Sequence, residues 1–140
     1  MSNMRIRLST LTFDAAGQGE KSEFAYAAHY EERGGECRLS FRRAEEGVST
    51  KTVLAFQKEV PEAVTMRERG GGEAELRFVP GTEQVSVYRV PGAGEFTLTL
   101  RTARVENTLS PTGGRLRLDY ETILGGARQR ILLTLLAEEG

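Results

Sequence analysis

Few side chains in this sequence are of the types that take a direct part in reactions. The chain has one histidine, His29, and one cysteine, Cys37, while aspartate occurs only at Asp14 and Asp119. Histidine is the usual general base near neutral pH, and a cysteine thiolate is the usual sulfur nucleophile. This small stock predicts that the protein is not an enzyme, and it predicts no catalytic residue, cofactor or metal site.

The spacing around His29 and Cys37 favours structural roles for both. Successive side chains of a strand point to opposite faces. His29 therefore points away from the face of Phe24 and Tyr26, towards solvent. Cys37 shares its face with Leu39, which indicates a buried thiol that packs as a small apolar side chain. A Ser-His-Asp arrangement needs a hydroxyl beside the imidazole, and nothing in the spacing supplies one.

The arginines recur in pairs two residues apart, so that each pair lies on one face of its strand. The pairs are Arg5/Arg7, Arg67/Arg69, Arg115/Arg117 and Arg128/Arg130. On neighbouring strands they would form a basic stripe able to hold phosphate or carboxylate. The alternative is a solvated face on which arginines form cross-strand ion pairs with glutamates. We favour the solvated face, because the net charge is −1 and no aromatic residues interleave with the arginines.

The tyrosines are the candidate ligand contacts. If the strands of Tyr26, Tyr30, Tyr88 and Tyr120 line one barrel mouth, the four can form a cradle with a nearby arginine. The alternative is that they fill a small barrel and bond their hydroxyls to the backbone at its rim. The predicted ligand-binding residues are Tyr30, Arg69, Tyr88, Arg89 and Tyr120.

The elements that must position these residues are strands. After the turn at 91–94, Phe96, Leu98 and Leu100 alternate with polar residues, as in a strand with one buried face. About ten such segments, separated by glycine-rich turns, predict an antiparallel up-and-down meander. Closing a long meander removes its edges. We therefore predict an all-β, single-domain barrel of eight to ten strands over residues 1–140, with a two-sheet sandwich as the alternative.

The apolar pattern of the first segment shifts by one position after Leu8. Leu11 and Phe13 then take over the apolar role. A one-residue shift turns a strand over, so this pattern predicts a β-bulge near Ser9 and Thr10.

The last segment, residues 128–136, fits either a helical face or a strand. The Gly125-Gly126 turn and the alternating Arg128 and Arg130 lead directly into it, and they favour the strand.

Composition narrows the setting of the protein. A single cysteine permits no internal disulfide, and the first residues contain no apolar run typical of a signal peptide or membrane span. These features predict a cytoplasmic protein with no membrane partner. The near-neutral charge provides no general attraction to nucleic acid.

Several short motifs, in their order along the chain, resemble the YwiB-like family of uncharacterised bacterial proteins, domain of unknown function 1934. The motifs are Tyr30-Glu31-Glu32, Thr50 and Thr52, Arg69-Gly70, Tyr88 before the Pro-Gly turn, Phe96 to Leu100, Thr102 and Tyr120. The resemblance covers nearly the full length. It implies a lipocalin-type (calycin) barrel, and it brings no established activity.

The function we expect is binding without catalysis. The leading prediction is a barrel that holds a small anionic or amphipathic ligand. The alternative is a protein- or RNA-interaction module, or a homodimer, that uses an Arg-rich outer face, with nucleic acid the less expected partner.

Overall fold

The fold consists of β-strands joined by short turns. The computed structural model describes residues 2–140, with every side chain among them except that of Glu45. The strands are β1 (Ser2–Phe13), β2 (Gly19–Arg33), β3 (Glu36–Glu45), β4 (Val48–Gln57), β5 (Val60–Arg69), β6 (Glu73–Phe78), β7 (Glu83–Val90), β8 (Gly94–Asn107), β9 (Gly113–Leu124) and β10 (Ala127–Glu139). No helix within residues 2–140 is long and apolar enough to cross a membrane.

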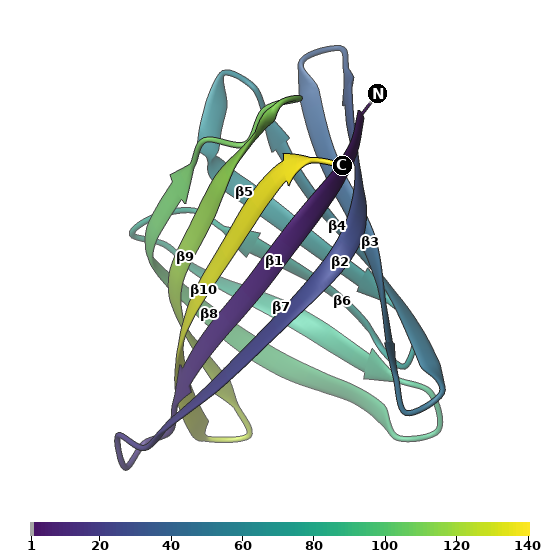
Figure 1. Ribbon diagram of the computed structural model, residues 1–140. Helices are drawn as coiled ribbons and strands as arrows, with labels where there is room; N and C mark the ends of the chain where they lie inside the picture. Colours follow the sequence, from purple (N-terminus) through teal and green to yellow (C-terminus); the bar gives the residue numbers. More distant parts are fainter. Residues whose placement is uncertain (1) are drawn as a thin grey trace.

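The ten strands close into one antiparallel barrel (Figure 1). Each strand pairs with its neighbours in the chain, and β1 also pairs with β10. The predicted all-β up-and-down barrel is therefore confirmed, as is the strand expected for residues 128–136, whereas the sandwich alternative is wrong. The ladder between β6 and β7 is the shortest, with Glu73 opposite Arg89 as its single paired position.

Alternate turns lie at opposite ends of the barrel. Both termini lie at one end, where the Gly140 N–H donates to the Asn3 carbonyl at 3.0 Å (Figure 1). The turns at 14–18, 46–47, 70–72, 91–93 and 125–126 lie at the other end, which we call the open end. Gly125 and Gly126, with φ of 57° and 82°, form the two-residue turn that matches the twist of a hairpin.

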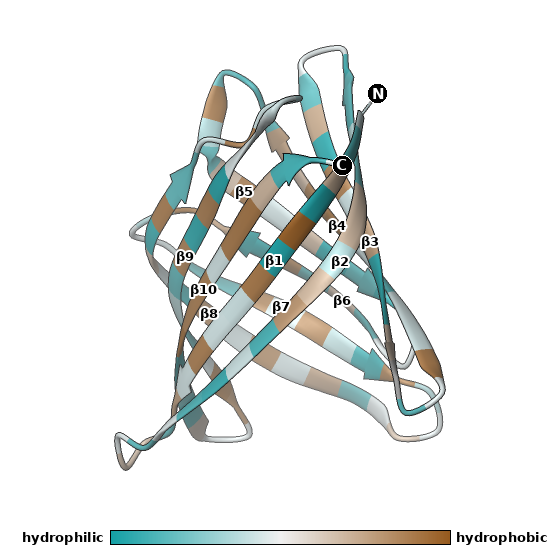
Figure 2. Ribbon diagram, viewed as in Figure 1, coloured by the Kyte–Doolittle hydropathy of each residue, from teal (hydrophilic) through white to brown (hydrophobic). Residues whose placement is uncertain are grey.

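The core fills the barrel towards the terminal end. Alternate residues of every strand point inward, and Figure 2 shows the matching bands of hydrophobic and hydrophilic residues along the strands. Leu39, Val64, Phe78, Leu116 and Leu135 are among the fully buried side chains. Burial of such side chains is the main favourable term in the stability of the barrel.

The predicted bulge in β1 is wrong. β1 pairs without interruption from Met4 to Phe13 along β10, so the parity of the strand never changes. Thr10 therefore faces the interior, opposite Ser22, and their hydroxyls are hydrogen-bonded. Leu11 lies on the outer face, opposite Leu132. Towards the open end some inward positions, such as Thr10 and Ser22, carry polar side chains, while the register of β1 stays the same.

Candidate functional site

The open end of the barrel is hollow. Along β4 the exposed fraction of inward-facing side chains falls from 45% at Val48 to 1% at Leu54. Along β8 it falls from 42% at Phe96 to 0% at Leu100. These side chains point into the barrel and still contact water. Five such residues, which we call the mouth residues, are Phe24, Val48, Tyr88, Phe96 and Leu124.

A cavity of about 790 Å³ opens at the mouth. Its apolar wall is formed by Phe24, Val48 and Tyr88. Arg43, Glu46 and Glu68 also line it, so charged groups share the surface with the apolar ones. Apolar walls with a few convergent polar groups are the usual composition of a small-molecule site.

An ion pair lies inside the barrel below the mouth residues. Nη2 of Arg43 on β3 donates to Oε2 of Glu68 on β5 at 2.7 Å. Both side chains are partly buried, with exposed fractions of 27% and 29%. Charges at this depth are less screened than those of a surface pair. The Nε atom of Arg43 is buried and has no hydrogen-bond partner among the described residues, so the guanidinium still has a donor to offer.

Two buried hydroxyls lie at the base of the same interior. Thr52 and Thr102 face inward, and neither Oγ1 atom has a hydrogen-bond partner among the described residues. Thr102 lies opposite Tyr120 in the ladder between β8 and β9. Burial, together with the Glu68 carboxylate, raises the pKa of Tyr120. We call these five residues, Arg43, Thr52, Glu68, Thr102 and Tyr120, the polar layer between the mouth and the apolar core.

Glycines hold the 70–72 turn against the cavity wall. A Cβ at Gly72 would come within 2.7 Å of the Tyr88 hydroxyl, so the tyrosine side chain rests on this residue. A Cβ at Gly70 would overlap the backbone of Ser49 and Thr50 on β4. Only glycine permits such close approaches, and the turn therefore fixes one side of the mouth.

The structure does not bring the predicted ligand-binding residues together. Tyr88 lies at the mouth, whereas Tyr30 and Tyr120 are buried. Tyr120 packs edge-on against Phe78, with ring centroids 4.8 Å apart, and burial raises the pKa of Tyr30. Arg69 and Arg89 point outward.

Tyr26, the remaining tyrosine of the predicted cradle, faces inward. Its ring stacks between those of Phe24 and Phe41, with centroid distances of 6.1 and 5.5 Å. The stack connects the mouth to the apolar core.

Sequence reasoning missed the charged pair at the centre of the site. The alternation of Cys37, Leu39 and Phe41, continued by two residues, places Arg43 inside the barrel. A charged residue at an inward position is the signal that could have identified it. Glu68 carries the same signal on β5, two residues after the buried Met66.

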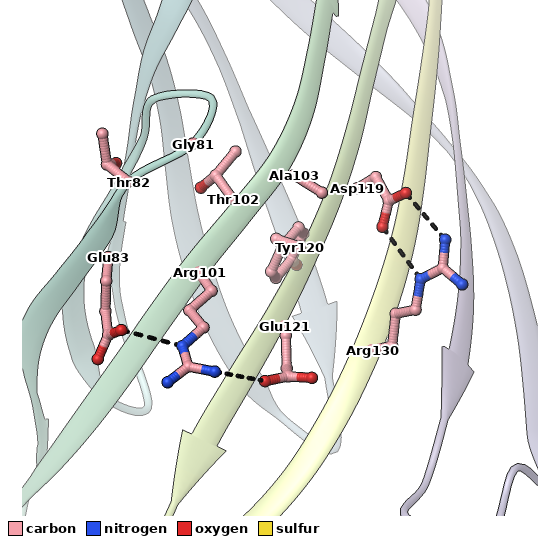
Figure 3. Close-up of a pocket in the computed structure, with 10 residues that line it drawn as sticks. All are labelled: Gly81, Thr82, Glu83, Arg101, Thr102, Ala103, Asp119, Tyr120, Glu121 and Arg130. Atoms are coloured by element: carbon pink, nitrogen blue, oxygen red, sulfur yellow. Dashed lines mark hydrogen bonds and ion pairs between the residues drawn. The ribbon is translucent and has the colours of Figure 1, made fainter.

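A second depression, of about 450 Å³, opens on the outer wall, and Thr102 and Tyr120 of the polar layer are among the residues that line it (Figure 3). Arg101 bridges Glu83 at 3.0 Å and Glu121 at 3.8 Å, and Arg130 pairs with Asp119 at 2.9 Å (Figure 3). The side chains in these cross-strand pairs are 24–57% exposed, as on an ordinary solvated sheet face. The charged side chains of this depression are already paired with one another, so we take the mouth as the candidate site.

The histidine and the cysteine lie outside the mouth. Nδ1 of His29 lies 3.4 Å from Oδ1 of Asn3 on the outer face. Cys37 is buried in the core. In the part of the chain that the structure describes, no three His, Cys, Asp or Glu side chains are grouped so that they could hold a metal ion.

Comparison with known proteins identifies the family. The family model described as Domain of unknown function (DUF1934) matches residues 6–130. The chain belongs to this family. The predicted family resemblance is thereby confirmed.

A solved structure shows the same fold as this DUF1934 chain. The crystal structure of the ywiB protein from Bacillus subtilis superposes with a TM-score of 0.88 at 21% sequence identity, covering 99% of this chain and 92% of that one. At this identity the similarity establishes the barrel fold alone. A search of the curated proteins found no match.

Proposed function

We propose that the open end of the barrel binds a small amphipathic molecule without transforming it. The observation that carries this proposal is that the mouth residues face the barrel interior and yet are 37–46% exposed. Apolar side chains that converge on a cavity and remain wet gain free energy when a ligand covers them, at about 25 cal/mol per Å² of apolar area.

The number of strands supports a hollow mouth. An eight-stranded barrel is just wide enough to be filled by side chains or to hold one small ligand, and the diameter grows with strand number. Ten strands enclose a wider bore. Phenylalanines and leucines fill it at the terminal end, and the cavity of about 790 Å³ remains at the other. This volume lies within the range of drug-sized ligand pockets.

The polar layer supports a ligand with hydrogen-bond acceptors at its buried end. Arg43 lines the cavity, and its Nε atom is a donor that the described protein leaves unpaired. A buried donor without a partner costs free energy, and a ligand carboxylate or carbonyl would remove that cost. The Glu68 carboxylate holds the Arg43 guanidinium in place, which lowers the entropy lost on binding.

The positions of the reactive side chains favour binding over catalysis. A general base or nucleophile must reach the bound molecule. His29 lies on the outer face and Cys37 is buried in the core, so neither lines the cavity.

The proposal is tested with an amphipathic anion as probe, 1-anilinonaphthalene-8-sulfonate, whose fluorescence rises in an apolar site. We expect saturable binding to the folded protein that weakens several-fold in Phe24→Ala and in Arg43→Gln. Val85→Ala is the matched control, because Val85 is an exposed apolar residue on the outer wall. Far-UV circular dichroism checks that each variant is folded, since partly folded states also bind this dye.

One pattern of variant effects would contradict the proposal. Suppose that Val85→Ala weakens binding of the dye, whereas Phe24→Ala and Arg43→Gln leave it unchanged. The dye then binds the outer wall, and the mouth is no ligand site. Native mass spectrometry of protein purified from its own host supplies the second readout, with a retained small molecule expected.

A further inference from the structure

The outer wall of the barrel follows one rule of charge placement. Wherever two charged residues lie directly opposite each other in the described ladders, with the exceptions described below, one is acidic and the other basic. Examples are Arg5/Glu138, Glu31/Arg38, Arg67/Glu75, Glu83/Arg101, Arg89/Glu95, Arg101/Glu121, Glu106/Arg117 and Glu121/Arg130. Unlike charges stabilise such cross-strand pairs, and like charges destabilise them.

Two consecutive ladder positions break this rule. Arg42 on β3 lies opposite Lys51 on β4, and Lys51 lies opposite Arg69 on β5. We call these three residues the basic row. They lie on adjacent strands about 4.8 Å apart, so the row spans about 10 Å. All three side chains are exposed, and among the described side chains none of them has an ion-pair or hydrogen-bond partner.

In the described ladders, the like-charge pairs are confined to these two neighbouring positions. On the far side of Arg69 the ladder returns to unlike pairs, with Glu73 opposite both Arg69 and Arg89. Positions at which a sequence breaks a local rule that it otherwise keeps are where function competes with stability. An anion laid along the row would remove the repulsion and supply the missing partners.

We propose that the basic row binds a condensed phosphate chain, such as the end of a polyphosphate or the triphosphate of a nucleotide. Arginine binds phosphate oxygens through a planar fork, and lysine binds them as a point charge. An evenly spaced row of three cations matches a linear anion with several charged groups. A single phosphate could contact only part of it.

The surroundings of the row argue against a single-stranded nucleic acid. Such strands stack their bases on aromatic side chains. The outward positions that flank the row on its strands carry no aromatic ring; they are Ser40, Ala44, Ser49, Val53 and Arg67. Most of these side chains are small, so a phosphate chain can approach the wall closely.

The site is independent of the mouth. Arg42 points outward, whereas its neighbour Arg43 points inward to Glu68. The two arginines therefore lie on opposite faces of the same sheet. Loss of mouth binding in Arg43→Gln should leave the basic row unaffected, and the two proposals fail separately.

Isothermal titration calorimetry with inorganic tripolyphosphate tests the proposal at constant ionic strength. We expect wild-type protein to bind tripolyphosphate, and the variant Lys51→Glu to bind at least about tenfold more weakly, since it loses a charge-assisted contact and gains a repulsive one. Sulfate at the same ionic strength controls for general salt stabilisation. A nucleoside triphosphate in a parallel titration distinguishes a nucleotide from a free phosphate chain.

Lys51→Glu has a second expected effect that ordinary loss-of-binding variants lack. Glutamate between Arg42 and Arg69 restores the pattern of unlike charges. Without anion the variant should therefore unfold at a higher temperature than the wild type. Lys51→Gln is the back-up variant, with the same directions and smaller shifts. Arg77→Gln is the matched control, because Arg77 is an exposed outward arginine opposite the uncharged Thr65.

Three results would overturn the proposal. One is tripolyphosphate binding that is equal in wild type and in both Lys51 variants. Another is no binding of tripolyphosphate by the wild type at millimolar concentration. The third is binding of a single-stranded oligonucleotide that depends on Lys51 and that tripolyphosphate does not displace, which would make the row a nucleic-acid contact.

Discussion

The division of the barrel into a filled end and a hollow end predicts very different costs for two phenylalanines that both point inward. Phe78 is fully buried against Tyr120, whereas the exposed fraction of Phe24 is 46%. Phe78→Ala removes a complete buried side chain and leaves a closed cavity, which costs about 3–5 kcal/mol. Phe24→Ala loses about half of a transfer free energy of about 1.5–3 kcal/mol, plus part of its ring contact with Tyr26, and leaves no closed cavity. We therefore expect about 1–2 kcal/mol for Phe24→Ala.

Urea unfolding followed by far-UV circular dichroism measures both costs. Unchanged m-values show that each variant still exposes the same surface on unfolding, so that the difference in midpoint reports stability. Equal costs would refute the hollow end. A loss above about 3 kcal/mol for Phe24→Ala would mean that the mouth is closed in solution, because a half-exposed ring cannot account for it.

Three further predictions concern the interior and its wall. Thr102→Val should raise the free energy of unfolding by about 1 kcal/mol in urea titrations, because it removes a buried hydroxyl without a partner; a loss would indicate a bound water there. The fold raises the pKa of Tyr30 and of Tyr120, so both stay protonated in the folded protein above pH 10.0 while they ionise in the unfolded chain. The free energy of unfolding should therefore fall above pH 10.0, by up to about 1.4 kcal/mol per pH unit for each of the two tyrosines. Tyr120→Phe should flatten that slope in urea titrations at successive pH values, and an unchanged slope would contradict its raised pKa. Gly72→Ala should lower the free energy of unfolding by about 1–3 kcal/mol, because the added Cβ overlaps the Tyr88 hydroxyl. Adding Tyr88→Leu to the same chain should recover part of this loss. If the costs of the two substitutions simply add, the two residues do not touch.

The architecture was predictable from the sequence because its causes are local. Side-chain direction alternates along a strand wherever that strand ends up, so Phe96, Leu98 and Leu100 could be placed on the inner face. Paired glycines such as Gly125 and Gly126 adopt the positive φ values that a tight hairpin requires. A regular series of such hairpins leaves few alternatives to a closed meander.

The wrongly predicted bulge in β1 shows where a local pattern misleads. The bulge follows only if apolar residues always face inward, and Leu11 faces outward. Whether an inward position is dry depends on how many side chains fill the barrel at that level, and that is a property of all ten strands together. At the open end the filling stops, so Thr10 can face inward and Leu11 outward without a bulge.

By itself, the sequence determined the strands, the turns, the alternation of side chains between the two faces of a strand and the scarcity of reactive groups. Only the tertiary structure decided which residues meet. Arg43 and Glu68 are 25 positions apart in the chain and 2.7 Å apart in the barrel, and the basic row joins residues of three strands. The physical reason is that alternation is set within each strand, whereas opposition across a sheet depends on register and closure, which the whole packed barrel determines.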